Sequence, residues 1–312
     1  SGLNTQNNIA SMKDLGEETI NRFIHLAENQ HEVRGVPSGF RDLDNKLSGF
    51  QKSDLIILAA RPSVGKTSLA LDLARNAAVK NGVPTVIFSL EMSKQQLVDR
   101  MLSAEAQVDG WKLRTGKLNM EEEISRLQEG MHKLMQAPIF VDDKPANTAM
   151  NMRSVLRKVS HEKQIGLVIV DYLQLMGTSK SYDNMVNQVT EISRSLKGLA
   201  KEFNVPVIAL SQLSRAVESR GGKPRLSDLR DSGSIEQDAD VVILIHREDK
   251  YGENKENADK KNIVEILIEK HRNGPTGIVE LYFDNKKTSF LSIEKNEFGD
   301  FQMPNIDNSV DF

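Results

Sequence analysis

The sequence predicts an α/β fold in which a mostly parallel, twisted sheet carries helices on both faces. Short apolar runs alternate along the chain with segments of helical periodicity, the pattern of strands joined by crossover helices. These runs are nearly continuous in apolar residues, as strands buried on both faces are. Gly65-Lys66-Thr67 also stands between one such run and a helical segment, a position typical of anion-binding turns in α/β proteins.

The segment before this core is expected to be a helix with its own apolar face. Residues 1–12 are polar and lack periodicity, whereas Asp14 to Val33 read as a helix with Asp14 and Glu17 as a capping pair. One stripe of this helix is apolar: Ile20, Phe23, Ile24 and Ala27. A single helix of this length is marginal in water, so it packs on its own domain or on a neighbouring subunit, and the residues alone leave both open.

The core elements follow in order after the Gly/Pro-containing segment 35–39. Six runs are expected to form parallel strands: residues 55–59, 85–90, 139–141, 167–170, 207–210 and 241–245. Helical patterns cover residues 67–80, 93–107, 120–135, 148–163 and 184–203. Runs 263–269 and 278–283, joined by a turn containing Gly274 and Pro275, predict a C-terminal antiparallel hairpin that extends the sheet. Three polar segments are candidates for mobility: 178–184, 215–225 and 248–261.

Length and composition bound the organisation. The chain has 312 residues, enough for one large domain, which we place at 35–295 between a helix within 13–34 and a polar tail over 296–312. It contains no cysteine, which excludes disulfides, cysteine-ligated zinc and thiol nucleophiles and suits a reducing cytoplasm. No apolar stretch approaches the roughly 20 residues that span a bilayer, so we expect a cytoplasmic protein without membrane contact. A net charge of −3 requires any nucleic-acid site to be local.

The turn at Ala60 to Thr67 is a phosphate-binding loop with one departure from the usual pattern. The pattern is G-x-x-x-x-G-K-[ST], and Ala60 stands at the first glycine. Gly65 lets the backbone approach an anion, Lys66 supplies a cation to the β and γ phosphates, and Thr67 offers a hydroxyl to Mg²⁺. We expect ATP or another nucleoside triphosphate to bind here, on these residues: Arg61, Ser63, Val64, Gly65, Lys66, Thr67 and Ser68.

Three strands end in polar residues suited to nucleotide hydrolysis. Asp171 ends run 167–170 and is placed like a carboxylate that organises Mg²⁺, so Thr67 and Asp171 form the expected metal site. Glu91 follows the second run, where it could accept a proton from an attacking water or merely precede a helix. Gln212 ends run 207–210 and could donate to a phosphate oxygen or merely mark the start of a loop.

Two basic features remain. Lys270 and Arg272 lie at the hairpin tip and point to the same side of an extended chain, so they are either a solvated pair or a pair that reaches an adjacent subunit's phosphate. The segment from Lys223 to Ser234 mixes cations, hydroxyls and a glycine without an aromatic residue. That composition suits sequence-independent contact with a nucleic-acid backbone, while a loop that caps a following helix is an equal reading.

Together these blocks resemble a known family. The sequence strings ARPSVGKT, FSLEMS, DYLQL, ALSQLSR, SDLRDSGSIEQDADVV and KHRNGPTG are similar to motifs of the DnaB family of bacterial or phage replicative DNA helicases. The resemblance covers about residues 13–295, and Ala60 fits it because the family's loop is similar to ARPSxGKT.

The resemblance implies a RecA-like P-loop ATPase core in a homo-hexameric ring that moves 5′ to 3′ on single-stranded DNA. It implies catalytic roles for Lys66, Glu91 as general base, Asp171, Gln212 as γ-phosphate sensor, and Lys270 with Arg272 as a trans-acting pair. Four residues match the loop that holds the DNA backbone: Arg230, Asp231, Ser232 and Gly233. Segment 14–33 matches the linker helix that docks on the next subunit. The resemblance also implies a helicase loader as a partner. Family members usually carry a further N-terminal domain that contacts primase; this sequence begins at the linker, so a primase contact stays open.

Two other functions fit parts of the pattern. A RecA-type recombinase would form filaments on DNA, but the segment from Ser227 to Val242 favours the helicase family. A scaffold or loader-like protein would bind nucleotide without turnover, and the combination of Glu91, Asp171 and Gln212 disfavours it.

Overall fold

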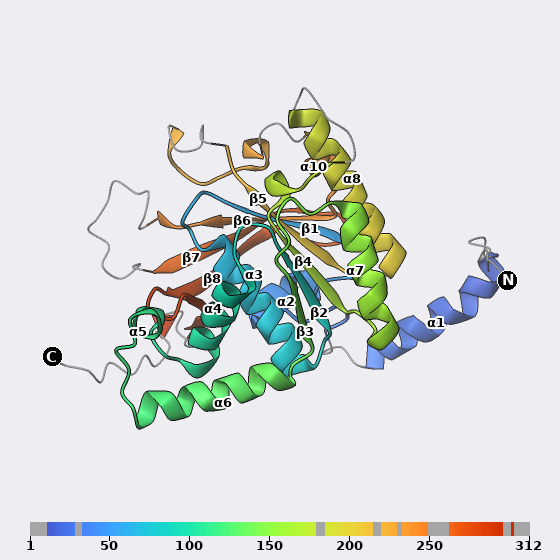
Figure 1. Cartoon of the computed structure of the whole chain (residues 1–312). Coiled ribbons are helices and arrows are strands. Elements are labelled where there is room, and N and C mark those ends of the chain that lie inside the picture. The colour runs from blue at the N-terminus through green and yellow to red at the C-terminus, as the bar shows by residue number, and fades with distance from the viewer. Residues whose placement is uncertain are drawn as a thin grey trace.

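The computed structural model describes residues 11–28, 33–178, 185–214, 220–229, 233–248, 262–295 and 301–302. Its centre is a nine-stranded sheet of order β3-β2-β4-β5-β1-β6-β7-β8-β9 (Figure 1). The parallel strands are β1 (Leu55–Ala60), β2 (Thr85–Ser89), β3 (Ile139–Asp142), β4 (Leu167–Asp171), β5 (Val207–Gln212) and β6 (Val241–His246). Neighbouring members of this set pair in parallel. The six predicted parallel strands are therefore confirmed.

The C-terminal strands continue the sheet in the antiparallel sense. β7 (Ile263–His271) pairs with β6 and with β8 (Gly277–Asp284), which confirms the predicted hairpin extension. β9 (Ser289–Ser292) adds an edge strand that the sequence analysis did not include, and β10 (Glu294–Lys295) pairs separately with β11 (Phe301–Gln302). β9 is only four residues long, too short for an alternating pattern to be recognised.

Helices pack on both faces of the sheet, as predicted. Residues Ile56 and Leu58 of β1 belong to one buried cluster, with α3 and α4, whereas Leu55 and Ile57 belong to a second cluster, with α7 and α8. Figure 1 shows these two pairs of helices on opposite sides of the strands. The helices of the core are α2 (Arg41–Leu47), α3 (Lys66–Arg75), α4 (Lys94–Ala106), α5 (Gly110–Thr115), α6 (Glu122–Gln136), α7 (Ala149–Glu162), α8 (Met185–Phe203) and α10 (Gly233–Asp238). A π-helical turn over Asn76–Lys80 prolongs α3, and 3-10 turns cover Leu173–Leu175 and Leu226–Asp228.

Three helical details differ from the sequence analysis. The short helices α2 and α5 were not predicted, because six or seven residues give less than two turns of periodicity. The first helix, α1 (Met12–Glu28), begins at Met12, so Asp14 lies inside its first turn rather than at its N-cap.

The polar segments expected to be mobile lie mostly outside the described residues.

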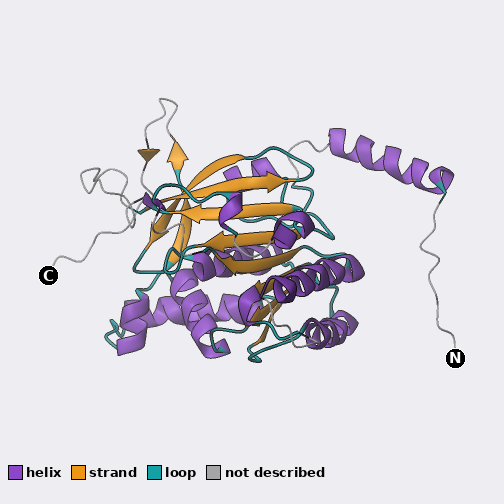
Figure 2. Ribbon diagram, turned by 90° about the horizontal axis from the view of Figure 1, so that it is seen from above, coloured by secondary structure: helices purple, strands orange, loops and turns teal. Residues whose placement is uncertain are grey.

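Helix α1 leaves its apolar stripe open. Figure 2 shows α1 projecting away from the rest of the fold. The side chains of Ile20, Phe23 and Ile24 are exposed by 59%, 55% and 52% of their surface. Across the described ranges, no helix has both the length and the apolar character needed to cross a bilayer.

Candidate active site

The phosphate-binding loop joins the buried strand β1 to helix α3. Gly65 is the N-cap residue of α3 and has φ 111°, a left-handed conformation that side chains rarely adopt. A Cβ atom at Gly65 would lie 3.1 Å from Cζ of Phe290, because the β8 and β9 aromatics pack beneath the loop. Phe283 and Phe290 contact each other with ring centroids 4.7 Å apart. The loop is thus supported from the C-terminal end of the chain.

The loop opens into a cavity of about 680 Å³. Eight of the residues predicted for nucleotide chemistry line it: Arg61, Ser63, Gly65, Lys66, Thr67, Ser68, Glu91 and Gln212. They come from the ends of β1, β2 and β5, which lie at the carboxyl edge of the sheet where α/β proteins bind ligands. Val64 does not line the cavity, because its side chain is 1% exposed and packs in the core. Only the backbone of Val64 is therefore left to contact a phosphate.

Asp171 at the end of β4 lies beside the loop. Its Oδ2 accepts a hydrogen bond of 2.8 Å from the Thr67 hydroxyl. Its Oδ1 is buried and has no hydrogen-bond partner within the described part of the chain. Burial raises the pKa of Asp171, and the nearby Lys66 and the Thr67 hydroxyl oppose that rise. A hydroxyl and a carboxylate with an oxygen left over are ligands that Mg²⁺ prefers, so these two residues fit the metal.

Lys66 is a largely desolvated cation. Its Nζ lies 4.4 Å from the ring centroid of Tyr172, in cation–π geometry. Burial lowers its pKa, while Asp171 and Glu91 act in the opposite direction. Glu91 itself is exposed to solvent at the cavity wall. The site therefore sets a half-buried cation beside two carboxylates, of which Asp171 is buried and Glu91 is open to water.

Lys270 and Arg272 lie at the amino-terminal ends of the parallel strands, opposite the ends that carry the phosphate loop. β7 runs antiparallel to β6, so its end pairs with the beginning of β6, and the backbone N–H of Arg272 donates to the carbonyl of Asp240. Asp240 in turn bonds to Leu55, the first residue of β1. Ala60, the last residue of β1, is five residues beyond Leu55 and so about 16 Å away at about 3.3 Å per residue, and the phosphate loop begins there. Both cations contact α10 and the residues just after it, at the end of β1 opposite their own chain's phosphate loop.

The expected DNA-binding residues are only partly described. Arg230, Asp231 and Ser232 lie outside the described residues. Gly233 is the first residue of α10, close to the helix start expected near Ser234.

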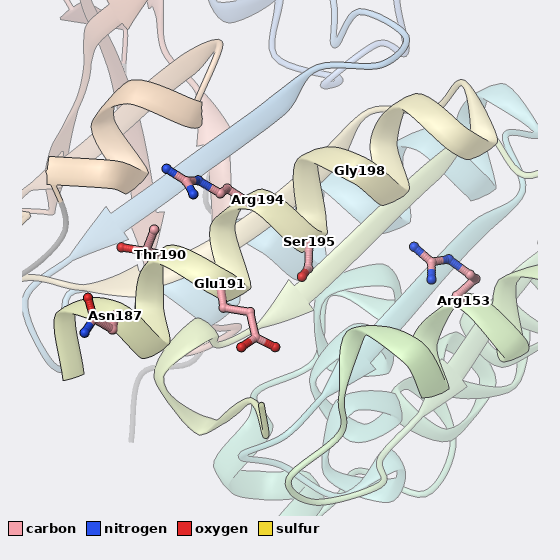
Figure 3. Close-up of a pocket in the computed structure, with 7 residues that line it drawn as sticks. All are labelled: Arg153, Asn187, Thr190, Glu191, Arg194, Ser195 and Gly198. Atoms are coloured by element: carbon pink, nitrogen blue, oxygen red, sulfur yellow. The ribbon is translucent and has the colours of Figure 1, made fainter. Parts of the chain in front are cut away.

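A second concave surface lies on α7 and α8. Figure 3 shows Thr190, Glu191 and Arg194 projecting from α8, and Arg153 from α7, around a groove of about 530 Å³. No predicted site residue lines this groove. The described residues also contain no cluster of three or more His, Cys, Asp or Glu side chains suited to a metal ion.

Several cavity residues were missed at the sequence level. Tyr172, Arg100 and Phe283 line the cavity, as do Asn285 and Thr288 in the turn between β8 and β9. Tyr172 directly follows Asp171 and could have been found from that position. Arg100 reaches the cavity from α4, whereas Phe283, Asn285 and Thr288 reach it through packing of the C-terminal strands, and no local sequence pattern predicts either.

Comparison with known proteins agrees with this geometry. The protein-family model for the DnaB-like helicase C terminal domain matches residues 35–292. The replicative DNA helicase DnaB of Geobacillus stearothermophilus is 48% identical over 296 residues, which is 94% of this chain and 64% of that protein. The replicative DNA helicase DnaC of Bacillus subtilis is 46% identical, with the same two shares. The chain thus spans about 64% of the length of these relatives.

Two solved structures share the fold. One is an ATPase domain with a TM-score of 0.85 and 35% identity, covering 92% of this chain and all of that one. A DnaB-like replicative helicase, studied with its primase interactions, has a TM-score of 0.82 and 35% identity, covering 93% of this chain and 68% of that one. With the RecA-like fold and the arrangement of the phosphate loop, these matches show that the chain belongs to the family of DnaB-like helicase C-terminal domains.

Proposed function

We propose that this chain is the motor of a replicative DNA helicase, which uses ATP hydrolysis to move 5′ to 3′ on single-stranded DNA and unwind duplex at the replication fork. The observation that carries the proposal is the cavity that joins the phosphate loop with Glu91 and Gln212. Binding alone needs only the loop, whereas a carboxylate and an amide at the same cavity supply what hydrolysis needs. The curated relatives named replicative helicases support the same function.

The chemistry follows from the positions of the side chains. Lys66 and the loop amides bind the β and γ phosphates, and the buried setting strengthens their attraction. Glu91 accepts the proton of a water that attacks the γ phosphorus in line with the departing oxygen. Gln212 donates to a γ-phosphate oxygen and so distinguishes the triphosphate from the diphosphate. Thr67 and Asp171 would hold Mg²⁺, which neutralises phosphate charge when bound.

The proposed site is completed by a second copy of the chain in a homo-hexameric ring. Lys270 and Arg272 lie at the far end of β1, about 16 Å of strand from the start of their own loop, which supports a role at a neighbour's γ-phosphate instead. The exposed stripe of α1 gives the ring a second contact, because Ile20, Phe23 and Ile24 can bury apolar surface on the next subunit. Residues 13–34 would then act as the linker, residues 35–295 as the motor domain and 296–312 as a tail.

The remaining partners follow from the family. The residues proposed to hold the DNA backbone are Arg230, Asp231, Ser232 and Gly233. DNA unwinding would take place in the cytoplasm. A helicase loader is a further proposed partner. A primase contact is described for the solved DnaB-like relative, and we extend it only to a protein that also carries the domain preceding the linker.

One pair of measurements tests this proposal. ATP hydrolysis is measured with and without single-stranded DNA, for the wild-type chain and for Lys66→Ala. We expect DNA-stimulated hydrolysis in the wild type and its loss in the variant, because the lysine neutralises the phosphates. Wild-type turnover in Lys66→Ala would refute the site, and nucleotide binding without any turnover by the wild type would favour a scaffold. Particles imaged with ATP and DNA should be closed rings, and filaments would instead indicate a recombinase.

A further inference from the structure

We propose that Asp240 is a positioning residue for Arg272, which holds the guanidinium at the edge of the sheet in the orientation that a neighbouring subunit's phosphate requires. The inference rests on the proposed function, in which Arg272 completes the site of the next subunit. Asp240 does not line the phosphate cavity, and it was not among the predicted site residues although the motif string from Ser227 to Val242 contains it.

The two oxygens of Asp240 have separate partners. Oδ2 accepts a hydrogen bond of 2.8 Å from the backbone N–H of Leu55 and a second one from Nζ of Lys197. Oδ1 accepts from Nη1 of Arg272 at 3.1 Å. The side chain is only 4% exposed, so the carboxylate is held firmly from the sheet side and offers one oxygen to the arginine. The backbone of Asp240 adds to this link, because its carbonyl accepts from the Arg272 N–H at 2.8 Å.

Arg272 is bound on one side and open on the other. A guanidinium has five N–H donors in a rigid fork. Nη1 contacts Asp240, and Nη2 contacts the carbonyl of Gln237 at 3.3 Å. The side chain nevertheless keeps 52% of its surface exposed. A free arginine carries about 2 kcal/mol of rotamer entropy, and part of it is already lost here before any phosphate arrives. This is the preorganisation that stabilisation of a transition state requires.

Asp240 belongs to a row of polar contacts that links α8 to α10 and the residues after it. Thr190, Ser193 and Lys197 are spaced three and four residues apart, which places them on one face of α8. The Thr190 hydroxyl donates to Ser234 at 2.8 Å, and the Ser193 hydroxyl donates to Asp238 at 2.6 Å. Lys197 reaches Asp240 in the same row. The position of Asp240 is thus fixed by the long helix α8 as well as by β1.

Lys270 is hydrogen-bonded to the same segment, which consists of α10 and the residues just after it. Its Nζ donates to the carbonyl oxygens of Glu236 and Ala239, at 2.5 and 2.7 Å. These carbonyls lie at the C-terminal end of α10, where a cation is favourable. Burial and the neighbouring Arg272 lower the pKa of Lys270. Both cations therefore take their position from α10 and the residues that follow it, and Asp240 is the carboxylate that contacts Arg272.

The test compares steady-state kinetics of ring-forming protein with MgATP and single-stranded DNA. Asp240→Asn keeps the acceptor for Leu55 but removes the charge that orients Arg272. We expect kcat to fall roughly 10- to 100-fold, the cost of a misplaced group, with KM for ATP within twofold of wild type. Asp240→Glu keeps the charge that Lys197 needs and displaces the carboxylate by one methylene. It should lose kcat with the same unchanged KM, which keeps the test decisive if the asparagine variant folds poorly.

A matched control separates positioning from stability. Glu123 is also a buried carboxylate, 9% exposed, which accepts from Nζ of Lys112 at 2.8 Å and from the N–H of Asn119 at 2.7 Å. It lies on α6, at the opposite end of the fold from α10, which Arg272 contacts (Figure 1). Glu123→Gln should lower the midpoint of thermal unfolding and leave kcat within twofold of wild type. Equal losses of kcat in Glu123→Gln and Asp240→Asn would overturn the inference.

ATP hydrolysis by rings that contain two different variants distinguishes a positioning role of Asp240 from a purely structural one. Asp240→Asn subunits have an intact phosphate loop, and Lys66→Ala subunits have an intact Arg272. Mixing the two should give more hydrolysis than either protein alone, and no gain on mixing would overturn the inference. Arg272→Ala is measured in parallel. If Arg272→Ala keeps wild-type kcat, the proposed function fails; if it is inactive and Asp240→Asn behaves as wild type, only the role of Asp240 fails.

Discussion

Replacing Gly65 by alanine tests how tightly the phosphate loop depends on its conformation. Gly65 has φ 111°, and an added Cβ would lie 3.1 Å and 3.3 Å from two atoms of the Phe290 ring. A non-glycine residue held in a sparsely populated backbone region costs about 1–3 kcal/mol. If the free loop relaxes and nucleotide binding must restore the strained form, that cost appears in the dissociation constant. An increase between about 5-fold and 150-fold is expected.

The assay is titration with a fluorescent ATP analogue, combined with thermal unfolding. Gly82→Ala is the matched control, because Gly82 also has a positive φ, 64°, but a Cβ there meets no atom within 4 Å. It should lower stability by about 1–2 kcal/mol and leave nucleotide affinity unchanged. A Gly65→Ala protein that binds nucleotide within twofold of wild type would refute the reasoning, since the loop would then tolerate a side chain in this conformation.

Three further predictions concern the core, the metal site and pH. Phe290→Ala should lower the free energy of unfolding by about 3–5 kcal/mol, because the ring is 2% exposed; a loss below about 1 kcal/mol in urea denaturation would contradict this. Thr67→Val should make nucleotide affinity nearly independent of Mg²⁺, and a wild-type response to chelation with EDTA would argue against Thr67 as a ligand. Burial and the neighbouring Asp240 raise the pKa of Asp54 from 3.8 to about 6, so the folded state favours the protonated form. Its contribution to stability is therefore present below about pH 4 and is lost as pH rises through 6; relative to Asp54→Asn, wild type should lose stability over this interval, and parallel curves would contradict the assignment.

The sequence predicted the sheet well because each buried strand is a continuous apolar run. Leu55–Ala60 and Val241–His246 are buried along their whole length, and such short, continuous apolar runs are typical of strands in a parallel sheet. Short elements were missed for the opposite reason. α5 spans six residues and contains no buried residue, so its pattern carries no periodicity to detect.

The candidate site divides in the same way. Glu91 and Gln212 lie at the ends of β2 and β5, and Gly65, Lys66 and Thr67 lie in the loop after β1, so the ends of these strands bring them to one cavity. Tertiary packing alone brings Asn285 and Thr288 to that cavity, and it alone sets Asp240 against Arg272. Local patterns cannot predict contacts whose partners are tens of residues apart.

The location of the phosphate loop and of Arg272 at opposite edges of one sheet has a genetic consequence. In the proposed ring, each chain contributes to two sites, one through its loop and one through its arginine. A chain that assembles normally but lacks Lys66 therefore disables one site, and a chain that lacks Arg272 disables its neighbour's. Inactive copies made beside intact ones enter the same rings and leave those rings with fewer working sites. Alleles of this kind should be dominant, whereas alleles that prevent folding never reach the ring and should be recessive.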